Sequence, residues 1–117
     1  MLIHDNLHLS ESSAILQQLC EHFQNELRGW YGNGLKEKAA INQLLSWYQG
    51  TYRPALSKIM ALKFGSVISG NPVKASDLAA AETKMKETLT FLNTLLSKGN
   101  TYLVGSNLTI ADLLIFH

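Results

Sequence analysis

The spacing of apolar residues divides the chain into a short extended part and a longer helical part. In LIHDNLHL, two short apolar stretches flank Asp5 and Asn6, which favours a β-hairpin with its turn at this pair. The stretch SESSAILQQLCEHF then opens with serines, which are favoured at helix starts. Apolar residues follow at helical spacing, namely Ala14, Ile15, Leu19, Cys20 and Phe23. The first 27 residues therefore predict strand, turn, strand and helix, which is too little to bury a core of its own.

The segment GWYGNG at positions 29–34 marks a change in character. Three glycines and one asparagine in six positions predict a linker or a tight loop. The pattern after it is helical, with one apolar stripe made by Ile41, Leu44, Leu45, Tyr48 and Tyr52. Pro54 removes a backbone hydrogen bond and clashes with the carbonyl of Gly50, so we expect a bend there. Beyond it the helix is predicted to resume through Met60 and Phe64.

A further helix is predicted after SGNPVKAS, which interrupts the preceding one. Ser76 and Asp77 are expected to start it, and Gly99 supplies a C-terminal cap. Its apolar stripe steps by three and four residues through Leu78, Ala81, Met85, Leu89, Leu92 and Leu96. The chain has no internal repeat and no low-complexity tract. It reads as a small mixed part joined to a bundle of long helices.

The stretch NLTIADLL near the end of the chain has the pattern of a deliberate helix start. The Thr109 hydroxyl is expected to accept from the backbone N–H of Asp112, and the Asp112 carboxylate to reach back to the Thr109 N–H. Leu108 is expected to pack on Leu113 as a hydrophobic staple. The helix that this cap begins would run only about two turns before the sequence ends.

Composition narrows the class of protein without naming a partner. The 117 residues are 46% apolar and carry a formal charge of +1, which indicates one domain at most. Ten basic and nine acidic residues form no block of like charge, which argues against nucleic-acid and polybasic membrane binding. Cys20 is the single cysteine, the first residues lack a secretion signal, and the apolar runs are too short for a membrane span. We therefore expect a cytoplasmic protein without a membrane segment.

Two motifs resemble one known family. The string YLVGSNLTIADLLIF, with Gly105 four residues before Thr109, resembles the C-terminal domain of glutathione transferases, and LLSWY in the helix after the linker extends the resemblance. LHLSESSAIL resembles the strand-to-helix junction of that family's thioredoxin-like N-terminal domain. The resemblance implies a mainly α fold, a truncated glutathione transferase C-terminal-like helical bundle preceded by a β-hairpin plus helix remnant of a thioredoxin-like domain.

The resemblance also implies a domain organisation. Residues 1–27 would be the C-terminal remnant of the thioredoxin-like, glutathione-binding domain, 28–34 the linker, and 35–117 an incomplete helical domain. Family members have a cis-proline that would fall immediately before Met1, and the Tyr, Ser or Cys that activates the thiol lies further upstream. We therefore expect a central fragment of a transferase, inactive by itself, with no catalytic residue of its own.

The same resemblance assigns the site residues. Glu11 would bind the glutathione ammonium, and Ser12, with its backbone N–H, the γ-glutamyl carboxylate. Glutathione would be a co-substrate whose thiolate attacks a small electrophilic substrate, with no cofactor needed. A homodimer is expected for the full-length protein. The less specific interpretation of Glu11 and Ser12 is a serine-rich helix start with an acidic residue favoured by the helix dipole.

Within the family, LLSWYQGTYRPAL is most similar to theta-like members, which place a tryptophan in this helix and an arginine six residues later. Here these are Trp47 and Arg53, and the arginine would face the acceptor-substrate pocket, where its charge could stabilise an electrophile. Gly50 and Pro54 depart from the pattern, which affects the direction of Arg53. Alternatively, Trp47 is a core or subunit-interface aromatic, as are Tyr48 and Tyr52, and Arg53 is solvated or paired.

The remaining candidates favour structural roles. The histidines at positions 4, 8, 22 and 117 show no metal-ligand spacing, so no metal site is expected. Cys20 lies on the apolar face of its helix, where burial makes a thiol inert. The competing function is a non-enzymatic protein-interaction module with the same fold, as in translation-factor subunits, and an inactive fragment is a third alternative. An intact Glu11–Ser12 pair favours the enzyme, because a scaffold needs no γ-glutamyl site.

Overall fold

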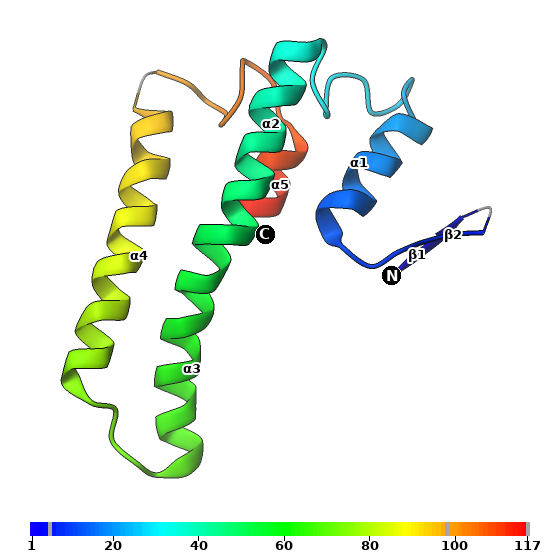
Figure 1. The fold of residues 1–117 in the computed structure, drawn as a ribbon. Helices are drawn as coiled ribbons and strands as arrows, with labels where there is room; N and C mark the ends of the chain where they lie inside the picture. The colour runs from blue at the N-terminus through cyan, green and yellow to red at the C-terminus, as the bar shows by residue number, and fades with distance from the viewer. Residues whose placement is uncertain (5, 98, 117) are drawn as a thin grey trace. The chain divides into compact units, whose positions relative to one another are not determined.

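The computed structural model describes residues 1–4, 6–97 and 99–116 and shows a mainly helical chain that opens with a hairpin (Figure 1). The elements are β1 (Leu2–His4), β2 (Leu7–Leu9), α1 (Ser12–His22), α2 (Leu35–Trp47), the π turn η1 (Tyr48–Tyr52), α3 (Arg53–Ser69), α4 (Ala75–Leu96) and α5 (Ile110–Phe116). The predicted order of strand, turn, strand and helix followed by long helices is confirmed.

The hairpin pairs β1 with β2 in antiparallel register, with Leu2 opposite Leu9. Asn6 has a left-handed backbone with φ of 66°, a conformation that a short amide side chain tolerates in tight turns. Asp5, the other residue of the predicted turn, lies outside the described residues. Only Ser10 and Glu11 separate β2 from the first residue of α1.

The chain forms two compact units, which are described separately. One comprises Met1–Leu45 and Gly99–His117, and the other comprises Ser46–Lys98. The residues of each unit contact one another more than they contact the other unit. The domain boundary that we expect at residues 28–34 stays a prediction.

In the first unit, α1 packs against α5 around a small apolar core. The buried side chains are those of Cys20, Ile41, Leu44, Leu45, Leu103, Ile110, Ala111 and Ile115. The part of the α2 stripe that falls in this unit is therefore buried as predicted. Phe23, predicted as the last residue of the apolar stripe of α1, is not part of its buried face, because its side chain is 43% exposed. The helix ends at His22, so Phe23 leaves the stripe and its ring meets the His22 ring edge-on at 4.6 Å.

In the second unit, α3 and α4 pack against each other as a helical hairpin (Figure 1). Its buried side chains belong to Ala55, Ala81, Thr88 and Leu92. The predicted stripe of α4 is wrong at one position, since Leu89 is 48% exposed while Thr88 is 2% exposed. Steps of four, three and four residues from Ala81 reach Thr88 and Leu92, whereas Leu89 turns about 100° away from Thr88. The buried Thr88 hydroxyl donates a hydrogen bond to the Met85 carbonyl at 2.7 Å.

A π turn lies directly before Pro54, where the sequence predicts a bend. The backbone N–H of Arg53 donates to the carbonyl of Tyr48, five residues back. The wider turn keeps the backbone bonded and makes room for the proline ring, which an α-helical carbonyl four residues back would obstruct. The interruption is at the predicted place, and its form is a widened turn in an otherwise helical run.

The ends of α4 differ slightly from the prediction. Lys74, with an extended backbone, is the N-cap residue, and its carbonyl accepts from the N–H groups of Asp77 and Leu78. Ser76 is therefore inside the first turn and does not start the helix. Asp77 remains in the first turn, where the helix dipole favours a carboxylate. Beyond the other end, Gly99 has a φ of 78°, as a glycine stop requires.

Candidate functional site

Glu11 and Ser12 occupy the strand-to-helix junction where the sequence places them. Glu11 is the N-cap of α1 with an extended backbone, and its carbonyl accepts from the Ile15 N–H at 2.9 Å. Its side chain makes no capping hydrogen bond within the described part of the chain. Ser12 is the first helical residue, and both side chains are exposed. The junction therefore presents a carboxylate beside backbone N–H groups that a helix start leaves without intrahelical partners.

Such a junction can bind a zwitterion. The N–H groups and the positive end of the helix dipole favour a carboxylate, and the Glu11 carboxylate favours an ammonium group. The chemistry required of the two predicted residues is thus available at one place. They line neither of the two pockets described below.

A hydrogen-bond network that the sequence did not predict joins α1 to α2. The side-chain oxygen of Asn42 accepts from Gln17 Nε2 at 3.0 Å and from the Tyr31 hydroxyl at 2.9 Å. Both bonds are partly buried. The sequence offers one local sign of this network, namely that Asn42 is a polar residue next to Ile41 of the apolar stripe. Its partners lie 25 and 11 residues away, a spacing that no local pattern reveals.

Lys38 and Glu21 add a second connection between the same two helices. Lys38 Nζ lies 2.5 Å from Glu21 Oε1 and 5.0 Å from the centre of the Tyr31 ring. The hydrogen bond to Glu21 raises the pKa of Lys38 above its ordinary value. Gln24 Nε2 also donates to the Glu21 carboxylate at 3.2 Å. The pair is exposed, so it contributes little to stability.

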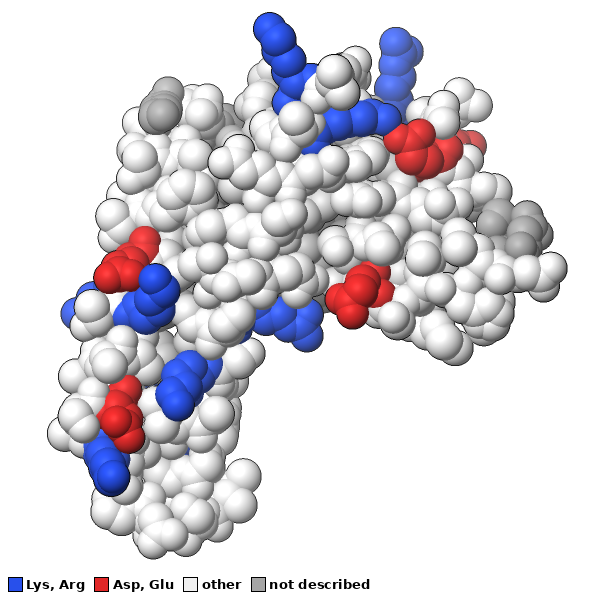
Figure 2. Space-filling model, viewed as in Figure 1, with Lys and Arg blue, Asp and Glu red and all other residues white. Residues whose placement is uncertain are grey.

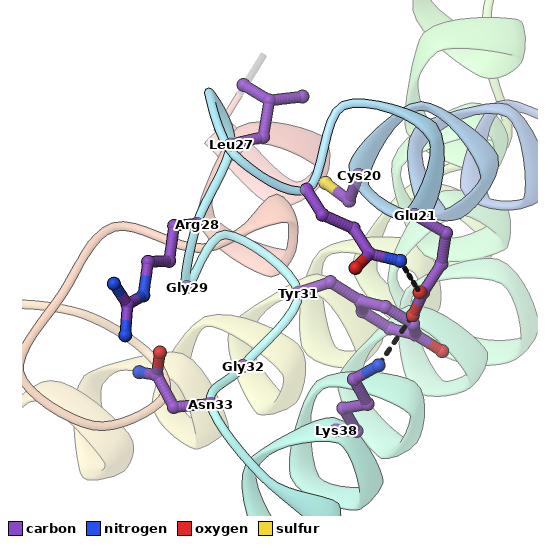
Figure 3. A pocket seen from close by; sticks show the side chains of 10 residues that line it. Cys20, Glu21, Leu27, Arg28, Gly29, Tyr31, Gly32, Asn33 and Lys38 are labelled. Carbon is purple, nitrogen blue, oxygen red and sulfur yellow. Dashed lines mark hydrogen bonds and ion pairs between the residues drawn. The ribbon is translucent and has the colours of Figure 1, made fainter.

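A pocket of about 180 Å³ opens beside this pair, at the end of α1. Figure 3 shows the Cys20 sulfur, the Glu21–Lys38 pair and the Tyr31 ring around it, with Arg28 and Asn33 on the loop side. Cys20 is buried as predicted, and burial raises the pKa of its thiol, with the Glu21 charge adding to the effect. A thiol in this state is a poor nucleophile.

The loop at 29–34 is held in place by close backbone contacts. Gly32 has a φ of 86°, and a Cβ there would lie 2.8 Å from the Glu37 Cβ. The Glu37 carboxylate accepts from the Asn33 N–H at 2.7 Å, which caps the start of α2. On the other side, the Trp30 carbonyl accepts from the Ile110 N–H at 2.9 Å. The loop predicted by the glycines is confirmed, because residues 29–34 lie outside the helices and strands.

Trp47 and Arg53 lie at the two ends of the π turn in the second unit. The Trp47 ring packs on Phe91 of α4 with centroids 4.7 Å apart, and on Tyr52 at 5.9 Å. Tyr52 stacks with Tyr48 at 5.8 Å. Trp47 therefore takes part in an aromatic cluster, and Arg53 is exposed at the first position of α3.

A second pocket, of about 370 Å³, lies between the π turn, α3 and α4. Its lining residues are Gly50, Thr51, Pro54, Ala55, Lys58, Ala81 and Lys84. Trp47 and Arg53 are outside it, so the structure does not bring the two predicted acceptor-site residues together around this cavity.

The surface charges are mixed. On the face seen in Figure 2, basic and acidic side chains lie interspersed. In the second unit, Lys84 pairs with Glu87 at 3.0 Å and Lys63 with Glu82 at 3.9 Å. Across the described residues, no group of three His, Cys, Asp or Glu side chains could hold a metal ion; His117 lies outside that range. No helix in the described part of the chain is long and apolar enough to cross a membrane.

The Thr109–Asp112 motif is a buried structural element. Asp112 Oδ2 accepts from the Thr109 N–H and from the Thr109 hydroxyl, both at 2.9 Å. The predicted carboxylate-to-backbone bond is confirmed. The predicted role of the hydroxyl is wrong, because it donates to the carboxylate and the Asp112 N–H bonds the Thr109 carbonyl instead. Asp112 Oδ1 also accepts from the Leu103 N–H at 2.8 Å, which ties the preceding loop to α5. The Leu108–Leu113 staple stays a prediction.

Comparisons with known proteins agree on one family. Residues 55–117, more than half of the chain, match the family described as "Glutathione S-transferase, C-terminal domain". Glutathione S-transferase T3 of Arabidopsis thaliana is 33% identical over 96% of this chain and 19% of its own length. Glutathione S-transferase T1 of the same plant is 32% identical over 96% of this chain and 46% of its own length.

A solved structure gives the same result for the fold. Human glutathione transferase theta-2, in complex with glutathione and an unknown ligand, superposes with a TM-score of 0.82 at 25% identity. The superposition covers 97% of this chain and 46% of the human one. The chain thus spans less than half the length of these relatives. It belongs to the glutathione S-transferase family, among the theta-like members.

Proposed function

We propose that this chain supplies the γ-glutamyl-binding end of a glutathione site, together with the adjoining helical domain, in a cytoplasmic glutathione transferase. The observation that carries the proposal is the junction between β2 and α1, where Glu11 and Ser12 stand at an exposed helix start. The family of the chain supports the choice of ligand.

The proposed contacts follow from charge and hydrogen-bonding capacity. The Glu11 carboxylate accepts from the glutathione ammonium group, a charge-assisted bond. The Ser12 N–H and hydroxyl donate to the γ-glutamyl carboxylate, whose charge the helix dipole also favours. Glutathione is a co-substrate in this scheme.

The reaction is a transfer of the glutathione sulfur to an electrophile. The thiol loses its proton to a base, the thiolate forms a bond with an electrophilic carbon, and the leaving group departs with its electron pair. In this proposal the group that activates the thiol is outside this chain. Trp47 and Arg53 are the candidates for contact with the acceptor substrate, and the exposed guanidinium of Arg53 could stabilise negative charge on it.

A segment exchange tests the proposal. The chain replaces the matching segment of Arabidopsis glutathione S-transferase T1. The resulting chimeric protein, the segment-exchanged transferase, is then assayed for glutathione transfer to a generic electrophile. Glu11→Ala should raise the KM for glutathione about tenfold, since it removes one charge-assisted bond, and leave the KM for the electrophile unchanged. Glu26→Ala, an exposed glutamate beyond the end of α1, is the matched control.

The competing interaction-module function predicts a different result. The exchanged protein would then fold without glutathione-dependent turnover, and Glu11→Ala would behave as Glu26→Ala does. Either finding would remove the enzyme proposal.

An exposed apolar face on α3 supports a homodimer. Leu56, Met60, Phe64, Val67 and Ile68 are 40–86% exposed and recur at helical spacing. Such a face on a helix favours a protein partner, and a second copy is the partner we propose. Sedimentation of the segment-exchanged transferase should show a dimer that Phe64→Glu weakens. A monomer at all concentrations would contradict it.

A further inference from the structure

The hydrogen-bond network centred on Asn42 joins α1 to α2 and has no role in the proposed reaction. One side-chain oxygen accepts two hydrogen bonds, from Gln17 on α1 and from Tyr31 on the loop that leads to α2. Both donors are partly buried, so water replaces these bonds poorly once the acceptor is removed.

The position of Gln17 makes this contact relevant to the start of α1. Gln17 lies five residues after Ser12 on the same helix, which is about one and a half turns. A rigid helix transmits a constraint over this distance. Holding Gln17 at 3.0 Å from Asn42 therefore limits both the rotation of α1 about its axis and its distance from α2.

We propose that Asn42 is a positioning residue for the glutathione site. Its side-chain oxygen fixes the orientation of α1 and thereby the direction of the Ser12 N–H and the Glu11 carboxylate at the start of that helix. This inference rests on the proposed function, because it assigns a role to α1 as a binding helix.

The other connection between the two helices does not replace Asn42. The Lys38 and Glu21 side chains are 38% and 44% exposed, so solvent screens their attraction. Lys38 also lies over the Tyr31 ring, so the loop tyrosine is held by both connections. Loss of Asn42 removes the two partly buried bonds and leaves the exposed pair.

Amide hydrogen exchange of the 117-residue chain tests the positioning step. Asn42→Ala should speed exchange in α1 about tenfold, because two partly buried donors lose their acceptor, and leave α4 unchanged. Asn42→Asp keeps an oxygen acceptor at the same place and should restore protection. Tyr31→Phe removes one donor and should give an intermediate rate. Asn93→Ala, the same substitution at an exposed position of α4, is the control.

A glutathione titration of the same variants tests the link to binding. Each substitution is placed in the segment-exchanged T1 transferase described above, and the amide signal of Ser12 is followed by NMR as glutathione is added. The exchanged transferase without a further substitution and its Asn42→Asp and Asn93→Ala variants should respond alike, whereas Asn42→Ala should require about tenfold more glutathione for the same response.

Three results would overturn the inference: unchanged exchange of α1 in Asn42→Ala, no recovery in Asn42→Asp, or faster exchange with an unchanged response of Ser12. An exchanged transferase, without a further substitution, whose Ser12 signal does not change with glutathione would count against the proposed function instead. The exchange rates would then still decide whether Asn42 orients α1.

Discussion

The starts of α1 and α5 carry similar residue types in different surroundings. At α5, the hydroxyl and carboxylate of Thr109 and Asp112 are buried and bonded to each other and to backbone N–H groups. At α1, Glu11 and Ser12 are exposed, and the Glu11 side chain makes no capping bond among the described residues. The polar side chains at the α5 start are bonded within the chain, whereas those at the α1 start are exposed to solvent.

The comparison shows that an acidic residue and a hydroxyl at a helix start do not by themselves indicate function. Burial and the identity of the partners decide between the two roles. A capped and buried start should show its importance in stability, whereas an open start should show it in binding. The predictions below test this division.

The largest effect is expected from Asp112→Ala. The change leaves two buried backbone N–H groups, those of Leu103 and Thr109, without acceptors. The free energy of unfolding should fall by about 3 kcal/mol, as measured by urea denaturation followed by circular dichroism. A loss below about 0.5 kcal/mol, the range of ordinary surface substitutions, would show that the α5 start is not a structural element.

A smaller effect is expected from Thr109→Ala. This variant keeps both backbone bonds to Asp112 and loses only the hydroxyl donor, so the cost should be about 1 kcal/mol. Thr109→Ser retains the hydroxyl and is the control. Equal losses in the alanine and serine variants would mean that the threonine methyl group, and not the hydroxyl bond, stabilises the motif.

At the open helix start, Glu11→Ala should change the free energy of unfolding by less than about 0.5 kcal/mol, because no capping bond is lost. The same urea measurement checks it. A loss as large as that of Thr109→Ala would show that Glu11 is a structural cap after all, and the contrast between the two helix starts would disappear.

The smallest effect concerns the other end of α1, where Lys38 bonds Glu21. Because the folded-state pKa of Lys38 is raised above 10.5, its contribution is complete below pH 10.5 and is lost as pH rises through the higher folded-state value. The stability difference between the wild type and Lys38→Met should therefore be small and constant near neutral pH and vanish in strong alkali. A difference that grows above pH 10.5 would contradict the sign of the shift.

Local patterns predicted most of the fold. Alternation and turn residues located the hairpin, apolar spacing located the helices, and the capping motif located the start of α5. The errors occur where contacts between residues far apart in sequence determine which side chain is buried or which form a turn takes. Leu89 and Thr88 are adjacent, and only packing against α3 determines which faces inward. The π turn is a backbone adjustment to Pro54 whose form no residue pattern specifies.

The candidate site also has features that follow from local sequence and features that depend on distant residues. The position of Glu11 and Ser12 at the helix start follows from the sequence, because the junction is local. The role of Asn42 does not, because its two partners come from a different helix and from a loop. The hydroxyl of Thr109 was predicted as an acceptor and is a donor, since the choice depends on where the Asp112 carboxylate lies.

The central claim is that the start of α1 is a binding site and the start of α5 is not, and one titration tests it directly. Backbone amide signals of the segment-exchanged T1 transferase, in which this chain has the rest of a glutathione site beside it, are recorded as glutathione is added. We predict a saturable shift at Ser12 that Glu11→Ala abolishes, with no change at Thr109. Equal shifts at both helix starts, or a shift at Ser12 that survives Glu11→Ala, would contradict the account.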